Sequence, residues 1–320
     1  MVLPKQKKEE NQMANLGRVA VLMGGNSSER EVSLMSGSGV LQALLAEGVD
    51  ARAFDPARRP MAELANFDRA FIAMHGRMGE DGNMQGFLNC LGVPYTGPGV
   101  TASAIAFDKE LTKTVWRRAG IPVPEGALVT AKTTRQEFER MLARWGQAGV
   151  VVKPARDGSS IGVTKLSHPT VQELEKAVVH ALTFSSDVLV EEYIHGREFT
   201  VAILDGKALP VIEIKAPEGS YDFQNKYYTD DVQYECPARL SAQETAQIQA
   251  HCEKAFAALG ARGWSRIDVL RGQDGRIVLL EMNTAPGMTP HSLVPMAARN
   301  VGMSYGALCV RLLRLAAKDL

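Results

Sequence analysis

Asp268, Glu281 and Asn283 are the residues whose types and positions most directly suggest chemistry. Carboxylate and amide oxygens are the ligands that a hard divalent cation prefers, and magnesium is usually held by one or two carboxylates together with substrate phosphates. The sequence therefore predicts a magnesium–nucleotide site, on condition that the fold brings these side chains to one place.

A β-hairpin within 262–293 is the element that would position them. Its predicted strands, RIDVL and RIVLLEMN, join at Asp274-Gly275, and Asp-Gly between apolar runs is a strong hairpin signal. With these two residues at the turn centre, Asp268 lies opposite Glu281 and Arg266 opposite Asn283, all on one face. Two facing carboxylates repel unless a cation lies between them, and this favours a metal site. The alternative is an exposed face that merely carries polar residues. The other face is expected to be core and carries Ile267, Val269, Leu280 and Met282.

The stretch VVVKPARDGSSIGVTKL is a second candidate for phosphate binding. It predicts two strands around a loop of glycine, serine and charge. Lys153 ends the first strand, and the backbone N–H groups of 158–160 could wrap a phosphate. The pattern G-x-x-x-x-G-K-[ST] is missing from the chain, so this is no Walker A loop, and an ordinary polar hairpin is the alternative.

Carboxylates also interrupt two predicted strands in the middle of the chain. VLVEEYI places Glu191 and Glu192 in a run that is otherwise apolar, and Glu198 follows in REFTVAIL. A carboxylate near a strand edge can accept hydrogen bonds from a ribose or an adenine amino group, or it can simply be solvated.

The N-terminal part predicts an α/β domain with a parallel sheet. The strand in GRVAVLMGG and those in VDARAFD and DRAFIAMHG alternate with helical stretches. Ser28 and Glu31 have capping-box spacing at the start of the first helix. The apolar positions of that helix, expected to face the sheet, are Val32, Met35, Val40 and Leu44.

Glu29 and His75 fall beyond the carboxyl ends of these strands, where ligands bind in such sheets. Glu29 could pair with the ammonium of a small substrate, or it could only favour the helix N-terminus through the helix dipole. His75 could be structural or catalytic. A dinucleotide-binding fold is disfavoured because GGNSSER lacks G-x-G-x-x-G spacing.

The remaining elements are helices and two loops. Helices are predicted over 108–119, capped by Asp108, over 241–259, and over 305–315, where the helix is amphipathic. The loop 215–231 carries four aromatic residues, which favours a packed lid. The loop NTAPGMTPHS after the hairpin could offer backbone N–H groups near Gly287 to an oxyanion or a carboxylate.

Composition narrows the class of protein. The 320 residues contain 36 Lys plus Arg and 36 Asp plus Glu, so net charge gives no general case for nucleic acid or an anionic membrane as partner. The four cysteines show neither metal-ligand spacing nor a disulfide framework, which favours a cytoplasmic location. We expect no membrane span and no signal peptide, and we expect residues 1–15 to be a disordered extension.

Seven motifs in order together resemble the D-alanine–D-alanine ligase family of ATP-grasp enzymes. They are GGNSSEREVSLMSG, FIAMHGRMGEDGNMQG, PYTGPGV, VKPARDGSSIGV, EFTVAIL, GWSRIDV and LLEMNTAPGMTPHSLVPMAAR. The resemblance implies a three-domain α/β (α+β) ATP-grasp fold, with a parallel N-terminal domain (16–108) and antiparallel sheets in a central (109–196) and a C-terminal domain (197–320). It also implies ATP as co-substrate, D-alanine as substrate, two Mg²⁺ ions that Mn²⁺ could replace, and a homodimer.

The resemblance further implies roles for individual residues. It assigns to metal binding Asp268, Glu281 and Asn283. For ATP, it implies that the phosphates contact Lys109, Lys153 and Lys226. The adenine would contact Glu191 and the Ile194 backbone, and the ribose would contact Glu198. The first D-alanine would be bound by Glu29 and His75. The carboxylate of the second D-alanine would be bound by Ser292 and Leu293. A hydrogen-bonded network that holds the lid closed would consist of Glu29, Ser159 and Tyr227. The tetrahedral centre would be stabilised by Arg266 and the Gly287 N–H.

Two positions depart from the family pattern, and two alternatives stay open. Glu192 stands where some members carry a lysine near adenine, and Ala285 replaces a serine of some relatives. The nearest alternative is another ATP-grasp carboxylate–amine ligase, for example of the D-alanine–D-lactate type. A nucleotide-binding protein without catalysis is the other.

Overall fold

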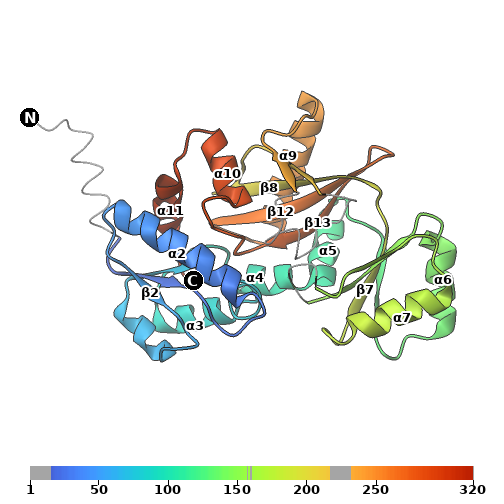
Figure 1. Cartoon of the computed structure of the whole chain (residues 1–320), viewed down its shortest axis with the longest axis horizontal. Helices are drawn as coiled ribbons and strands as arrows, with labels where there is room; N and C mark the ends of the chain where they lie inside the picture. Colours follow the sequence, from blue (N-terminus) through green and yellow to red (C-terminus); the bar gives the residue numbers. More distant parts are fainter. Residues whose placement is uncertain (1–15, 157, 159–160, 217–231, 320) are drawn as a thin grey trace, which may run out of the picture.

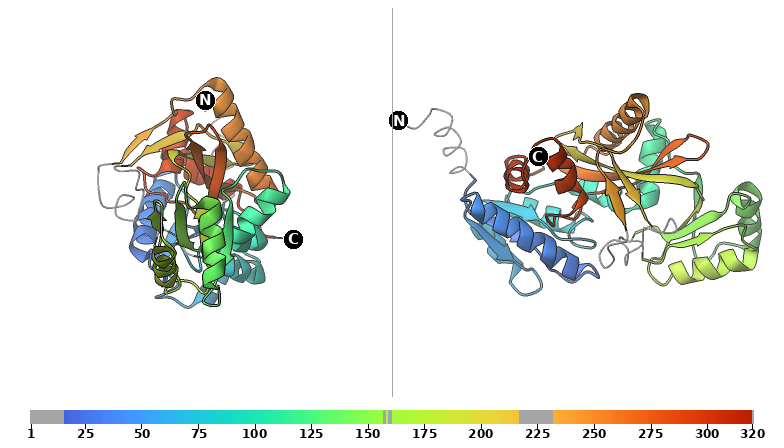
Figure 2. Two further views of the ribbon diagram at one scale, coloured as in Figure 1. Left: turned by 90° about the vertical axis from the view of Figure 1, so that its right-hand side faces the viewer. Right: turned by 45° about the horizontal axis from the view of Figure 1, so that its top comes forward.

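Three sheets with their helices form the molecule (Figure 1). The computed structural model describes residues 16–156, 158, 161–216 and 232–319. The expected extension 1–15 and most of the expected lid 215–231 lie outside the described residues. A parallel sheet lies at one end of the long axis, a four-stranded antiparallel sheet at the other, and a six-stranded antiparallel sheet between them (Figures 1 and 2).

The first sheet is parallel, as predicted. Its order is β2-β1-β3, from β1 (Val19–Leu22), β2 (Ala51–Phe54) and β3 (Arg69–Ile72). The connecting helices are α2 (Arg30–Ala46), the 3-10 helix η1 (Met61–Asn66) and α3 (Asn83–Leu91). The strands therefore end together, beside the start of α2.

The predicted start and packing face of α2 need correction. The helix begins at Arg30 with Glu29 as N-cap and no side-chain cap bond, so the capping box of Ser28 and Glu31 does not form. Met35 is 48% exposed, so its prediction as a sheet-facing residue is wrong. The buried face instead includes Gly37, where a Cβ would lie 2.4 Å from the Met23 side chain. A small residue there lets the helix approach the chain just after β1.

The central sheet has the antiparallel order β4-β7-β5-β6. Its strands are β4 (Gly126–Val129), β5 (Val150–Pro154), β6 (Thr164–Leu166) and β7 (Val188–Glu192). The helices α6 (Arg135–Trp145) and α7 (Val171–Ala181) each begin with a complete capping box and share an apolar core with the sheet. Figure 2 shows this lobe at the far end of the molecule from α2.

The six-stranded sheet has the order β11-β10-β8-β12-β13, with β9 paired to β8. Its strands are β8 (Gly196–Leu204), β9 (Lys207–Ala208), β10 (Ile212–Lys215), β11 (Gln233–Glu235), β12 (Trp264–Gly272) and β13 (Ile277–Asn283). One core contains residues of this sheet and of α4 (Val100–Phe107), α5 (Lys109–Arg118) and α9 (Ala242–Ala258). Another joins it to the first sheet, α10 (Leu293–Asn300) and α11 (Tyr305–Arg314). The helices predicted over 108–119, 241–259 and 305–315 are thereby confirmed.

The hairpin β12–β13 has the predicted residue pairs at the end away from its turn, but the turn itself differs from the predicted two-residue turn. Asp268 pairs with Glu281 and Arg266 with Asn283. At the turn, Gly272 N–H donates to Arg276 O (2.8 Å), so the loop has three residues, 273–275, rather than two. A bulge in β13 restores the register, because Val269 pairs with residue 279 and Asp268 with residue 281.

The bulge moves one residue to the opposite face. Leu280 is the extra residue and lines a cleft together with Asp268 and Glu281, so its prediction as core is wrong. Leu279 takes the core position instead and is fully buried.

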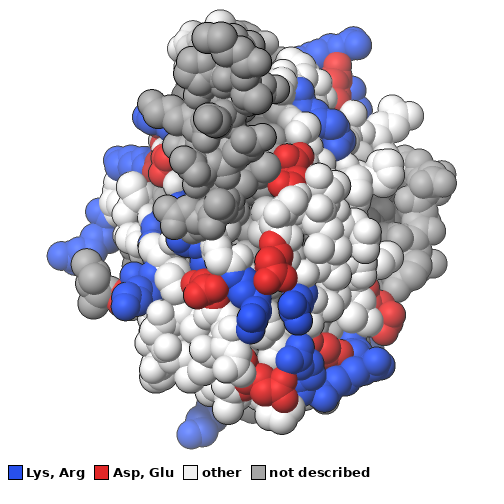
Figure 3. Space-filling model, turned by 90° about the vertical axis from the view of Figure 1, so that its left-hand side faces the viewer, with Lys and Arg blue, Asp and Glu red and all other residues white. Residues whose placement is uncertain are grey.

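Charge is mixed on the face that Figure 3 shows, where positive and negative side chains alternate. No helix of the described ranges combines the length and apolar character needed to cross a membrane.

Candidate active site

A cleft of about 460 Å³ lies between the central sheet and the six-stranded sheet. Its walls come from β5, β7, β8, β10, β12 and β13, and it brings together the predicted ATP residues that the structure describes. These are Lys109, Lys153, Glu191, Ile194 and Glu198. Lys226 lies outside the described residues.

A second cleft, of about 510 Å³, lies where α2, the loop after β3 and the loop after β13 meet. Asp268 lines the first cleft, and the second brings together seven further predicted residues: Glu29, His75, Arg266, Asn283, Gly287, Ser292 and Leu293. Glu281 and Gly158 line both clefts, so the two cavities meet at these residues. Ser159 and Tyr227 lie outside the described residues.

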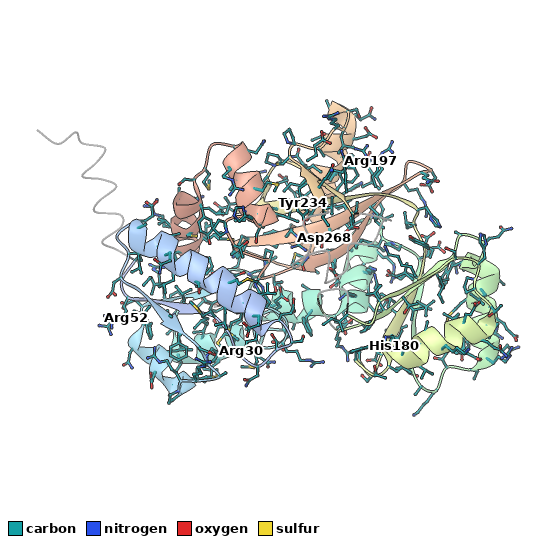
Figure 4. All side chains as sticks on the ribbon, in the orientation of Figure 1. Arg30, Arg52, His180, Arg197, Tyr234 and Asp268 are labelled. Atoms are coloured by element: carbon teal, nitrogen blue, oxygen red, sulfur yellow. The ribbon has the colours of Figure 1, made fainter. Side chains whose placement is uncertain are left out.

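Asp268 is the centre of the predicted metal face, and Figure 4 shows it on the sheet that also carries Tyr234. It is 5% exposed, and its carboxylate accepts hydrogen bonds from Arg266 (2.9 and 2.8 Å), Thr200 Oγ1 (2.7 Å) and Asn283 Nδ2 (3.1 Å). Across the strand pair, Glu281 Oε2 lies 3.3 Å from Lys109 Nζ. Cationic side chains thus balance both carboxylates.

The donor set fits magnesium better than a softer metal. Within the described ranges, no three His, Cys, Asp or Glu side chains come together as a metal site. Two facing carboxylates and an amide instead lie at the junction of the clefts, which suits an ion that takes its remaining ligands from phosphate and water.

A buried ion cluster lies in the wall of the first cleft where β5 and β7 meet α5. Glu191 is 2% exposed and binds two ammonium groups: Lys153 Nζ at 2.6 Å from Oε2, and Lys113 Nζ at Oε1. Burial alone would raise the pKa of Glu191, but the two lysines outweigh burial and lower it. Burial and the neighbouring Lys153 lower the pKa of Lys113, whereas Glu191 overcomes burial at Lys153 and raises its pKa.

Lys113 was missed by the sequence reasoning. It follows Lys109 by one helical turn on α5, and this i, i+4 spacing on a helix capped by Asp108 is the signal that could have found it. Glu192, the departure from the family pattern, pairs with Arg276 at 3.0 and 3.1 Å.

His75 connects the first sheet to the loop after β13. Its Nδ1 lies 2.8 Å from Ala285 O, so Nδ1–H donates to that carbonyl, and Nε2 accepts from Ser36 Oγ at 3.0 Å. Burial lowers the pKa of His75 and outweighs the opposing charge of Glu29, so the ring is neutral. A neutral ring in this tautomer fixes the loop that carries Gly287.

Two carboxyl groups flank Gly76 in the second cleft. Glu29 is 6% exposed, and a Cβ on Gly76 would lie 2.7 Å from its Oε2. The Gly76 N–H donates to Glu80 Oε2 at 2.9 Å. Burial raises the pKa of Glu80 to about 8, and the charge of Glu29 adds to this. Sequence reasoning missed Glu80, for which the sequence offers no signal beyond its place five residues after His75.

The N-terminus of α10 faces the second cleft. Ser292 is the N-cap, and Ser292 and Leu293 both line the cavity. The Ser292 hydroxyl accepts from Thr289 N–H (3.0 Å) and makes no cap bond to the helix. Free N–H groups at a helix start favour a negatively charged group, so this end suits a carboxylate.

The fold and the two joined clefts define the class. Two antiparallel sheets that enclose a cleft with lysines on one wall and magnesium-type ligands on the other are the features of an ATP-grasp enzyme.

Comparisons with known proteins agree with this class. A family model described as D-ala D-ala ligase N-terminus matches residues 51–98, and one described as D-ala D-ala ligase C-terminus matches residues 115–314. The D-alanine–D-alanine ligase of Delftia acidovorans is 54% identical over 95% of this chain and 94% of its own length. That of Paracidovorax citrulli is 53% identical over 95% and 91%.

Solved structures agree as well. The crystal structure of D-alanine–D-alanine ligase from Bacillus anthracis complexed with ATP has a TM-score of 0.80 and 30% identity, covering 93% of this chain and 97% of that one. The VanG D-Ala:D-Ser ligase from Enterococcus faecalis has a TM-score of 0.79 and 28% identity, covering 93% and 98%. The present chain belongs to the D-alanine–D-alanine ligase family.

Proposed function

We propose that this chain joins two D-alanine molecules into D-alanyl-D-alanine for peptidoglycan precursor synthesis, converting ATP to ADP and phosphate. The observation that carries the proposal is the shared wall of the two clefts at Glu281 and Gly158. An acid bound in the second cleft has its carboxylate next to the phosphate end of the first cleft. This arrangement serves phosphorylation of that carboxylate.

In the first step, a carboxylate oxygen of the first D-alanine attacks the γ-phosphorus of ATP, which gives an acyl phosphate and ADP. Glu29 would hold the ammonium of this D-alanine, and neutral His75 would keep the adjoining loop in place. Lys109, Lys153 and Lys226 would position the phosphates. Phosphoryl transfer depends mainly on positioning and on charge stabilisation, which these residues provide.

ATP placed in the first cleft would also have contacts to its adenine and ribose and to its metal ions. Glu191, the Ile194 backbone and Glu198 would bind adenine and ribose. Asp268, Glu281 and Asn283 would hold two magnesium ions, which manganese could replace. When bound, the metal offsets negative charge on the phosphoryl group that is transferred.

In the second step, the deprotonated amine of the second D-alanine attacks the acyl carbon, and phosphate leaves as the amide bond forms. Arg266 and the Gly287 N–H would stabilise the tetrahedral oxyanion, while Ser292 and Leu293 hold the carboxylate of this second molecule. Acyl phosphates hydrolyse in water, so a closed lid has a chemical purpose. We assign to lid closure a network of Glu29, Ser159 and Tyr227.

The test is phosphate release from ATP and magnesium with D-alanine, with L-alanine as control, and mass spectrometry of the product. Release that requires D-alanine and yields the dipeptide supports the proposal. The same assay with D-serine or D-lactate added as second substrate tests whether this chain has the activity of a related ligase instead. ATP binding without release on addition of any D-amino acid would refute the proposed reaction.

We also propose a homodimer, which follows from family membership. Light scattering at several protein concentrations would test it, and a mass of one chain, 34.7 kDa, throughout would refute it.

A further inference from the structure

Among the described residues, the wall of the first cleft near Lys153 contains more buried ammonium groups than carboxylates. Lys113 is fully buried, and the Lys153 side chain is 11% exposed, yet the two ammonium groups share the single carboxylate of Glu191. The nearby pair of Lys109 and Glu281 is balanced and does not change the sum. With all groups ionised, the described residues of the cluster carry one excess positive charge; burial lowers the pKa of Lys113 to about 7, so the excess is largest below pH 7. Burying an unpaired charge is costly, so the excess needs an explanation.

Helix α5 holds Lys113 in one position. The N-cap Asp108 accepts from Glu110 N–H (3.1 Å) and from Arg156 Nε (2.6 Å), which ties the helix start to the loop after β5. Further along, Trp116 Nε1 donates to Ala255 O (3.1 Å) of α9. Lys113 therefore lies on a helix fixed at both ends.

Lys113 and Lys153 differ in their access to the nucleotide. Lys153 lines the first cleft, as does Glu191, whereas Lys113 lies behind Glu191 and forms no part of the cleft wall that the described residues make. Lys113 therefore does not contact a nucleotide in the cleft directly, and it acts on the cleft wall through Glu191 and the neighbouring Lys153. A carboxylate has two oxygens, and Lys113 occupies Oε1 while Lys153 occupies Oε2.

We propose that Lys113 is a positioning residue for ATP: it competes for Glu191, so that Glu191 cannot neutralise Lys153, and the charge of Lys153 stays available to the nucleotide phosphates. The inference rests on the proposed use of ATP. On this view the excess charge is balanced when the phosphates arrive. Without Lys113, both oxygens of Glu191 turn to Lys153, and the cluster becomes neutral before ATP binds.

The first experiment compares wild type with Lys113→Met by titration calorimetry of magnesium-ATP, without D-alanine. We expect Kd for ATP to rise about tenfold, since one favourable charge is lost near the phosphates. In the steady state, KM for ATP should rise while KM for D-alanine stays within about twofold. Arg117→Met is the matched control, because it removes one positive charge from an exposed position on the same helix and should leave Kd unchanged.

A purely structural role predicts the opposite pattern. If Lys113 served stability alone, Lys113→Met would lower Tm without changing Kd, and this result would overturn the proposal. We expect only a small change in Tm without nucleotide, because the pair of Glu191 and Lys153 that remains is neutral. If Lys113→Met does not fold, Lys113→Gln carries the same expectation, because it keeps a hydrogen-bond donor for Glu191 and lacks the charge.

A double variant tests the competition itself. In Lys113→Met with Glu191→Gln, no carboxylate neutralises Lys153, while the amide oxygen of glutamine can still accept from the adenine amino group, so Kd for ATP should be lower than in Lys113→Met alone. Binding weaker than in either single variant would contradict the competition. Direct ATP binding separates this inference from the proposed reaction. A wild type that binds ATP but makes no dipeptide refutes only the reaction, whereas unchanged ATP binding by Lys113→Met refutes only the role of Lys113.

Discussion

Glu80→Gln should change how the stability of this protein depends on pH. Glu80 lies in the second cleft beside Glu29, and burial followed by the charge of Glu29 raises its pKa from 4.5 to about 8. In the folded protein without substrate, the carboxyl is therefore mostly protonated at pH 7. In the unfolded chain, the same group is ionised at that pH.

The sign and size of the change in unfolding free energy with pH follow from proton linkage. An acid whose folded pKa lies above its unfolded pKa binds more protons in the folded state, so stability falls as pH rises between the two values. For Glu80 this window runs from 4.5 to about 8. The free energy of unfolding should fall by about 1.4 kcal/mol per pH unit within the window, and by at most about 5 kcal/mol in total.

Urea unfolding followed by circular dichroism at several pH values between 5 and 8 would measure this. Glutamine has the shape of glutamate without the titrating group, so the difference between wild type and Glu80→Gln should grow with pH in favour of the variant. Glu31→Gln, at an exposed carboxylate of α2, is the control and should follow wild type. Parallel profiles for wild type and Glu80→Gln would show that Glu80 is ionised in the folded state and would refute the reasoning.

Five further substitutions test the site and the register. Asp268→Ala should lower magnesium-dependent turnover by at least about 100-fold, and full activity would refute the metal face. Thr200→Val removes the hydroxyl that donates to Asp268 at 2.7 Å, so the magnesium concentration for half-maximal rate should rise about tenfold or more; an unchanged titration would contradict this. Tyr227→Phe should alter the preference between D-alanine and D-lactate as second substrate, and an unchanged preference would count against its role in the lid network. Leu279→Ala should cost about 3 kcal/mol of stability, whereas Leu280→Ala should mainly raise KM for ATP; equal losses of stability would refute the bulge.

Local signals in the sequence predicted much of this fold. Asp108 caps α5 because its carboxylate accepts from the N–H groups of the first turn, and such a bond depends only on neighbouring residues. The parallel pairing of β1, β2 and β3 was predicted from strands that alternate with helical stretches, a pattern equally visible in the sequence. Strand alternation also predicted that Asp268 faces Glu281 and Arg266 faces Asn283, as the hairpin shows, while their use as metal ligands stays a prediction from oxygen chemistry.

The errors and omissions concern contacts between segments far apart in the chain. Met35 has the spacing of a core residue, but α2 packs through Gly37, because the chain after β1 comes too close for a larger side chain. Lys113 and Glu191 are 78 residues apart, and the pKa of Glu80 is raised by burial and then by the charge of Glu29, a residue 51 positions earlier in the chain. Periodicity within one element carries no information about such pairs.

The hairpin β12–β13 contains two departures from the predicted pairing that cancel at the metal face. A three-residue turn in place of a two-residue turn shifts every pair near the turn by one, and Gly275, at φ +85°, supplies the left-handed residue that such a turn needs. The bulge at Leu280 shifts the register back, so Asp268 again faces Glu281. A bulge turns one extra side chain to the bulged face, and here that side chain is apolar and lines the first cleft. The same irregularity therefore keeps the two carboxylates opposite each other and adds an apolar side chain to the wall of the proposed nucleotide site.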